Sequence, residues 1–146
     1  MSRIALVLPA VLLLLILALF AQNQTPKGSA YAAVPAEDAG KANPIKSTAE
    51  SLARGKKWWG IDCAMCHGDN GDGKGDVAQD SKLQIVNFTD PATLKDRTDG
   101  EIAWVIKNGY QDMPPEGPRV KPDDIWNLVN YVRSLSKPKS ETGQKP

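Results

Sequence analysis

The feature that most constrains this chain is the pentapeptide Cys-Ala-Met-Cys-His at residues 63–67. The 146 residues include two cysteines and one histidine, and all three lie within these five positions. Any fold and any function proposed for the chain must therefore account for Cys63, Cys66 and His67 together.

Three kinds of chemistry compete for these side chains. A structural zinc site wants four tetrahedral ligands, and the motif supplies three. A thioredoxin-like dithiol sits on a βαβ framework, which this sequence does not predict. Covalent haem attachment needs two thiols that reach the two vinyl groups on one edge of the porphyrin, and an imidazole beneath the iron. The motif therefore predicts one covalently bound haem c, attached through Cys63 and Cys66, with His67 as an axial iron ligand. A disulfide within the motif stays open, although its very small loop would stabilise little.

A second axial ligand has to come from elsewhere in the chain. Of the three methionines, Met1 lies at the N-terminal end and Met65 lies between the two cysteines. Met113 lies in the stretch GYQDMPPEG, where two prolines cannot continue a helix and stiffen the chain that carries the thioether. We expect Met113 to be the second axial ligand. The alternative is that Met113 only fills a gap in the core, as methionine often does.

The N-terminal part of the chain is strongly apolar. From Ile4 to Ala21 the run IALVLPAVLLLLILALFA has no charged residue, and Arg3 precedes it. Its length is at the lower edge of a bilayer-spanning helix and slightly exceeds a signal-peptide core. We expect a membrane anchor, with a cleaved signal peptide as the alternative. In either case the residues after Ala21 are exported, so the protein lies on the periplasmic side of the cytoplasmic membrane, or is soluble in the periplasm after cleavage.

Composition divides the rest of the chain. Residues 1–21 form the anchor or signal peptide, and residues 22–46, rich in Ala, Pro, Gly, Lys and Asn, are expected to be a flexible tether. Residues 47–137 form the working domain, and the polar residues 138–146 are expected to be a disordered tail. Lys and Arg number 18 against 17 for Asp and Glu, so the charge balance gives no indication of a nucleic-acid partner.

Helix-start signals recur within the working domain. Ser47 with Glu50 and Thr98 with Glu101 each form the pattern of a capping box. Pro122 opens a third helix, and Asp90 followed by proline can begin a further short helical turn. The last helix has an apolar stripe at helical spacing, and no alternating pattern indicates strands. The stripe consists of Ile125, Leu128, Val129, Val132 and Leu135. The sequence predicts a small all-α domain with long loops.

Between about Ser47 and Lys137 the chain resembles the class I c-type cytochromes. It is most similar to small bacterial mono-haem forms and to the c-type domains of cbb-type haem-copper oxidase subunits. The resemblance rests on four segments, namely GKKWWGIDCAMCHG, GDGKG, FTDPATLKDRTDGEIAWVIKNGYQDMPP and DDIWNLVNYVRSL. It implies the small cytochrome c fold, with three to four helices around one haem.

The resemblance also implies roles for single residues. Gly55 would let the first helix cross the last one closely, with Tyr131 packed at the crossing. Trp59 would lie near the haem, and Trp104 and Trp126 would line the pocket or the core.

One departure concerns the partner of the histidine. Family members often carry a proline soon after the glycine-rich segment, in a region that supplies a carbonyl to the second ring nitrogen of the histidine. Asp76 stands at this position here, so the acceptor for His67 Nδ1–H is not identified by the sequence.

Function follows from the ligation. An iron with two strong protein ligands has no open position for a substrate, so it exchanges single electrons without remaking bonds. We expect an electron carrier rather than an enzyme, working between respiratory or photosynthetic redox partners at the outer face of the membrane. Two alternatives stay open. One is a haem-bearing relay subunit of a larger oxidase or dehydrogenase complex, and the other is a ligand-binding or peroxidase-like haem protein.

Overall fold

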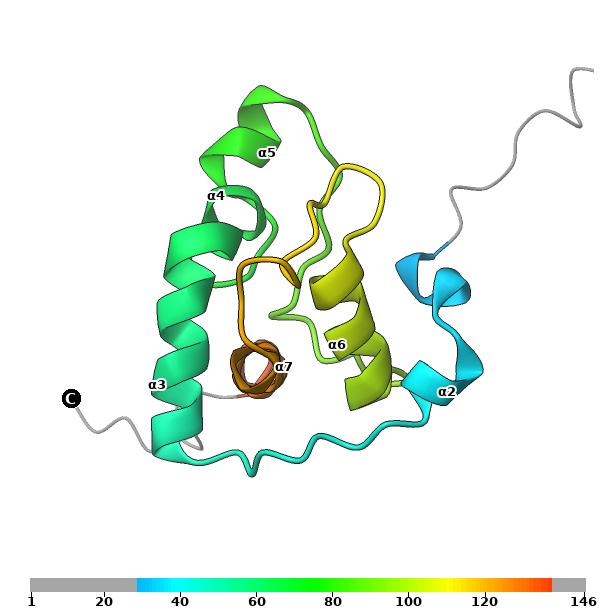
Figure 1. Cartoon of the computed structure of the whole chain (residues 1–146). Coiled ribbons are helices and arrows are strands. Elements are labelled where there is room, and N and C mark those ends of the chain that lie inside the picture. Colours follow the sequence, from blue (N-terminus) through cyan, green and yellow to red (C-terminus); the bar gives the residue numbers. More distant parts are fainter. Residues whose placement is uncertain (1–28, 138–146) are drawn as a thin grey trace, which may run out of the picture.

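The computed structural model describes residues 29–137, and this part of the chain is helical with a single isolated bridge. Helix α7 lies at the centre of Figure 1 and is seen end-on, with α3 on one side and α6 on the other. The elements in chain order are η1 (Ala30–Ala33), α2 (Ala36–Ala39), α3 (Ala49–Trp58), η2 (Trp59–Cys63), α4 (Ala64–His67), α5 (Asp76–Asp80), α6 (Asp99–Asn108) and α7 (Pro122–Ser134). For these residues the all-α prediction is confirmed.

The core is centred on the apolar face of α7. Ile125, Leu128, Val129 and Val132 are buried and Leu135 is half-buried, which confirms the predicted stripe. The facing side of α6 adds three buried apolar residues, and Trp59, Phe88, Leu94 and Val120 complete the same cluster. Burial of one such stripe holds the small domain together, since each fully buried aliphatic side chain contributes about 1.5–3 kcal/mol.

Helices α3 and α7 cross in close contact at Gly55. A Cβ atom added at Gly55 would lie 2.3 Å from the Asn127 carbonyl oxygen and 2.7 Å from Tyr131 Cβ. The carbonyl oxygen belongs to the backbone of α7, and Cβ is bonded directly to that backbone. Neither atom can move without moving the helix. The role that the resemblance implied for Gly55 and Tyr131 is therefore confirmed.

Two of the four predicted helix starts are confirmed, one is displaced, and one is replaced by turns. Thr98 and Glu101 form a complete capping box, and Pro122 opens α7. The N-cap of α3 is Thr48, whose side chain accepts a hydrogen bond from the Ser51 amide, so the cap predicted at Ser47 is wrong by one residue. After Asp90 the chain forms successive turns instead of a helix.

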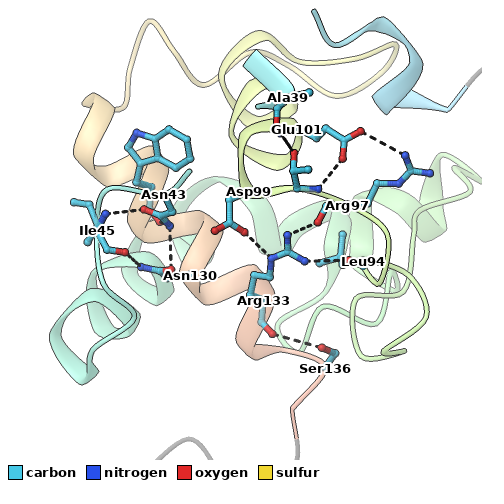
Figure 2. Close-up of polar contacts among 12 residues, drawn as sticks. Ala39, Asn43, Ile45, Leu94, Arg97, Asp99, Glu101, Asn130, Arg133 and Ser136 are labelled. Carbon is cyan, nitrogen blue, oxygen red and sulfur yellow. Dashed lines mark hydrogen bonds and ion pairs between the residues drawn. The ribbon is translucent and has the colours of Figure 1, made fainter. Parts of the chain in front are cut away.

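The described part of the predicted tether lies against the domain. Thr98 Oγ donates a hydrogen bond to the Ala39 carbonyl oxygen, at 2.7 Å, and the Tyr31 ring lies 4.5 Å from the guanidinium carbon of Arg97. The Asn43 amide donates to the Trp126 carbonyl oxygen and to Asn130 Oδ1, as Figure 2 shows in part. Residues 29–46 therefore run along α6 and α7 through specific contacts.

Arg133 fastens the loop before α6 to α7 (Figure 2). Its Nε donates to Asp99 Oδ1 at 2.8 Å, and its other nitrogens donate to the carbonyl oxygens of Leu94 and Arg97. Arg133 thereby provides hydrogen-bond donors for two backbone carbonyl oxygens that lie outside any helix. Within residues 29–137 no helix is both long and apolar enough to span a membrane, and the apolar run Ile4–Ala21 lies outside the described residues.

Candidate haem-binding site

The motif lies at the end of one continuous helical run. Helix α3 passes through the π-helical turn η2, which ends at Cys63, into α4, which carries Cys66 and His67. Both cysteines are free and half-buried. This continuity places both thiols and the imidazole within about one turn of each other, and π-helical turns are frequent at functional sites.

The loop after the motif folds back over α4. The Gly73 amide donates a hydrogen bond to the His67 carbonyl oxygen at 2.8 Å, and the Gly75 amide donates to the Cys66 carbonyl oxygen at 3.2 Å. The indole Nε1–H of Trp59 donates to the Gly68 carbonyl oxygen at 3.1 Å. These bonds satisfy the carbonyls at the C-terminal end of α4, where a helix leaves them without intrahelical partners.

The His67 ring lies among aromatic side chains. Phe88 stacks on it with ring centroids 5.3 Å apart, and Trp59 lies 5.6 Å away in a tilted arrangement. Burial lowers the pKa of His67 to about 4, so the imidazole is neutral at neutral pH, which is the form that binds metals. The buried Nδ1 atom has no hydrogen-bond partner among the described residues. Asp76, the departure from the family pattern, begins α5.

The Cys63 thiol has an environment that disfavours its ionised form. Burial raises the pKa of Cys63 to about 12, and the negative charges of Glu116 and Asp62 act in the same direction. A redox dithiol reacts through its thiolate, which is scarce at Cys63 at neutral pH, and the described residues form no βαβ framework, so the thioredoxin-like interpretation is disfavoured. Within residues 29–137 no group of three or more histidine, cysteine, aspartate and glutamate side chains is arranged to hold a metal ion, which disfavours the zinc interpretation.

Met113 lies in the loop that follows α6. This helix ends at Gly109, whose φ of 72° favours glycine. The next residues close a tight turn, in which the Tyr110 amide donates to the Met113 carbonyl oxygen at 3.0 Å and the Met113 amide donates back at 2.9 Å. The half-buried Met113 side chain packs against the same core cluster that Cys63 contacts.

These residues fit a covalently attached haem. The two free thiols lie three positions apart on one helical run, the imidazole is neutral, and a thioether contacts the core cluster that Cys63 also contacts. The sequence did not predict that Phe88 would stack on His67, since the two lie 21 positions apart and share no local pattern.

Sequence reasoning also missed a charged cluster beside Cys63. Arg119 forms ion pairs with Asp62 and with Glu116, and both carboxylates belong to largely buried side chains. The position of Asp62 directly before the motif was the available signal, but sequence alone does not identify its partner.

Trp104 and Trp126 share one groove. Both line a groove of about 340 Å³, together with residues of α6, α7 and the N-terminal segment. Trp126 also packs against the core cluster, so the core interpretation holds for this residue. None of the predicted haem-binding residues is among those that line the groove.

Comparison with known proteins matches this geometry to one family. The family described as cytochrome c oxidase, cbb3-type, subunit III matches residues 50–132, which include the motif, Met113 and most of α7. Over 83 residues the chain is 35% identical to the cbb3-type cytochrome c oxidase subunit FixP of Azorhizobium caulinodans, covering 56% of this chain and 26% of that protein. The chain thus spans about a quarter of the length of this curated relative.

A cytochrome c domain of this type carries covalently bound haem c with its iron, and its chemistry is electron transport. The chain belongs to the family of cbb3-type cytochrome c oxidase subunit III.

Proposed function

We propose that this protein is a haem-bearing electron-relay subunit of a membrane oxidase complex, and that it passes single electrons at the outer face of the membrane. The observation that carries the proposal is the family match across the haem motif and the methionine loop. The similar FixP protein is itself named as an oxidase subunit, which favours a relay subunit over a free carrier.

The proposed roles of the site residues follow from their chemistry. Cys63 and Cys66 would attach the haem covalently, and His67 and Met113 would bind its iron. When bound, the haem supplies an iron that alternates between the ferrous and ferric states. With both of these side chains on the iron, no position would remain open for a substrate, so the site would be suited to electron transfer.

The surrounding residues set the conditions for that transfer. Trp59 and Phe88 are both buried, and their rings lie against His67. Water is thereby kept from the imidazole, and a low-polarity environment disfavours the extra positive charge of ferric iron. We expect this setting, together with a methionine ligand, to raise the reduction potential relative to a solvent-exposed bis-histidine haem.

The proposal is tested on the full chain with its own N-terminus. Membranes are solubilised in a mild detergent and separated by size, and the haem of this chain is followed by its absorbance. We expect it to migrate with a larger oxygen-reducing complex and to be oxidised when oxygen is added. Migration as a single chain, still reducible and unable to bind carbon monoxide, would instead support the free carrier.

A third outcome would contradict electron transfer altogether. If the isolated native protein binds carbon monoxide readily, its iron has an open position. The ligand-binding or peroxidase-like alternative would then replace the relay.

A further inference from the structure

Arg119 joins two buried carboxylates beside the haem-attachment motif. Its Nη1 donates a hydrogen bond to Asp62 Oδ1 at 2.9 Å. Its Nη2 donates to both oxygens of Glu116, at 2.9 and 2.8 Å. The side chains of Asp62 and Glu116 are 11% and 4% exposed, whereas that of Arg119 is 55% exposed. We refer to Arg119, Asp62 and Glu116 as the Arg119 clasp.

The clasp links the two segments that carry the proposed haem-binding residues. Asp62 belongs to η2 and directly precedes Cys63. Glu116 follows Met113 by three positions, and the two residues between them are prolines. Proline fixes φ, so little slack remains between the thioether and the carboxylate that Arg119 binds. Holding Glu116 in place therefore limits where Met113 can go.

The segment that follows Met113 is also hydrogen-bonded to α6. The Glu116 amide donates to the Ile106 carbonyl oxygen at 3.0 Å, and the Gly117 amide donates to the Lys107 carbonyl oxygen at 2.9 Å. These bonds fasten the segment to α6 and do not reach the motif. Arg119 supplies the ion pair that connects it to η2.

The guanidinium of Arg119 suits both carboxylates by its charge and its shape. Without Arg119, Asp62 and Glu116 would be two largely buried negative charges without their counter-ion, which is strongly unfavourable. Asp62 Oδ2 is buried and has no hydrogen-bond partner among the described residues, so Asp62 already has little other support. The planar guanidinium binds one carboxylate with each of two nitrogens, whereas the ammonium of lysine acts as a point charge.

We propose that Arg119 is a positioning residue for the methionine side of the haem site. By binding Glu116 and Asp62 together, it holds the chain after Met113 against the attachment helix and keeps the thioether on the iron. This inference rests on the proposed ligation by Met113.

The test uses the haem-loaded protein and the variant Arg119→Met, which removes the charge but retains length. We expect the weak charge-transfer band from methionine sulfur to ferric iron to diminish. We also expect ferric protein to bind cyanide about tenfold faster, which corresponds to about 1.4 kcal/mol of lost support for the ligand. In Arg119→Lys, the band intensity and the rate of cyanide binding should lie between those of native protein and Arg119→Met. Lysine restores the charge but cannot bind both carboxylates with the geometry of a guanidinium.

Arg54→Met is a closely matched control. Arg54 is also 55% exposed, and its Nη2 lies 2.8 Å from Asp124, whose side chain is 8% exposed. This pair joins α3 to α7 and does not involve the methionine loop. We expect Arg54→Met to lose stability but to retain the band and the native rate of cyanide binding.

Each remaining outcome is decisive. A native band and native cyanide rate in Arg119→Met overturn the inference, as does an equal loss of the band in Arg54→Met, which would indicate general destabilisation. A native protein that lacks the band, and whose spectrum Met113→Ala does not change, overturns the methionine ligation itself and the role of Arg119 with it.

Discussion

At the scale of single residues, the neighbours of His67 keep its ring in the neutral form that the proposed ligation requires. Trp59 and Phe88 exclude water from the ring, and the resulting burial lowers the pKa of the imidazole to about 4. The metal-free imidazole is therefore neutral at neutral pH, which is the form that binds a metal.

Met113 can be tested by truncation to alanine. Its backbone forms both hydrogen bonds of the turn with Tyr110, so Met113→Ala removes the thioether and leaves the turn bonds possible. We expect loss of the methionine-to-ferric band and a lower reduction potential, because the thioether favours the ferrous state. Carbon monoxide and cyanide should bind, whereas native protein binds them slowly or not at all. Spectroscopy and redox titration provide the measurement.

Met65→Ala is the matched control for that variant. Met65 lies between the two cysteines and is 55% exposed, so its thioether packs little and is poorly placed for ligation. We expect its spectrum and potential to stay native. If Met113→Ala also leaves both unchanged, Met113 is a packing residue and the sixth ligand must be sought elsewhere.

The prediction of a haem c came from a short local pattern in the sequence. Cys63, Cys66 and His67 are recognisable because haem attachment requires a fixed spacing within one helical turn. Phe88 and Arg119 reach the site only through tertiary contacts, and no short pattern records which distant residues a fold will bring together. The chemistry was therefore predictable, whereas most of its environment was not.

At the scale of elements, the helix boundaries depend on rules of different precision. The side chains of Thr98 and Glu101 each accept a hydrogen bond from the other residue's backbone amide. This reciprocal pattern identifies Thr98 as the N-cap of α6. Ser47 and Thr48 can both cap a helix, and only the structure distinguishes them. Helix α5, with five residues, is too short to give a periodic pattern, and the sequence did not predict it.

The crossing of α3 and α7 makes a sharp prediction. In Gly55→Ala, the new methyl group would collide with the Asn127 carbonyl oxygen and Tyr131 Cβ, and the helices would have to separate. We expect a loss of about 2 kcal/mol in the free energy of unfolding, since overpacking outweighs the better helix propensity of alanine. Urea unfolding followed by circular dichroism measures this.

Gly60→Ala provides the comparison within the same helical run. A Cβ atom at Gly60 would meet nothing within 4 Å, so we expect unchanged or slightly higher stability. Equal stability of the two variants would mean that the helices can separate freely and that the close crossing is not required.

At the scale of the whole molecule, the docking of residues 29–46 determines how much chain would separate the domain from the predicted anchor. Residues 29–46 contact α6 and α7, so if Ile4–Ala21 is an anchor, residues 22–28 are the remaining link. Fully extended, this link reaches at most ~25 Å. A domain held this close would meet the same membrane partners repeatedly, which suits a relay more than a diffusing carrier.

Asn43 is the residue on which this docking can be tested. Its amide donates to the Trp126 carbonyl oxygen at 3.1 Å and to Asn130 Oδ1 at 3.0 Å, and its own oxygen accepts from the Ile45 amide. Asn43→Ala removes all three bonds, and we expect a loss of about 1–3 kcal/mol in the free energy of unfolding. The segment should also detach more often, so trypsin should cleave after Lys41 and Lys46 faster than in native protein.

Asn108→Ala is the control for this variant. It loses one exposed, local hydrogen bond to the Trp104 carbonyl oxygen and should leave both the stability and the cleavage rate unchanged. Equal cleavage rates in native protein and Asn43→Ala would mean that the segment is held by other contacts or is not held, and the short-link argument would then lose its basis.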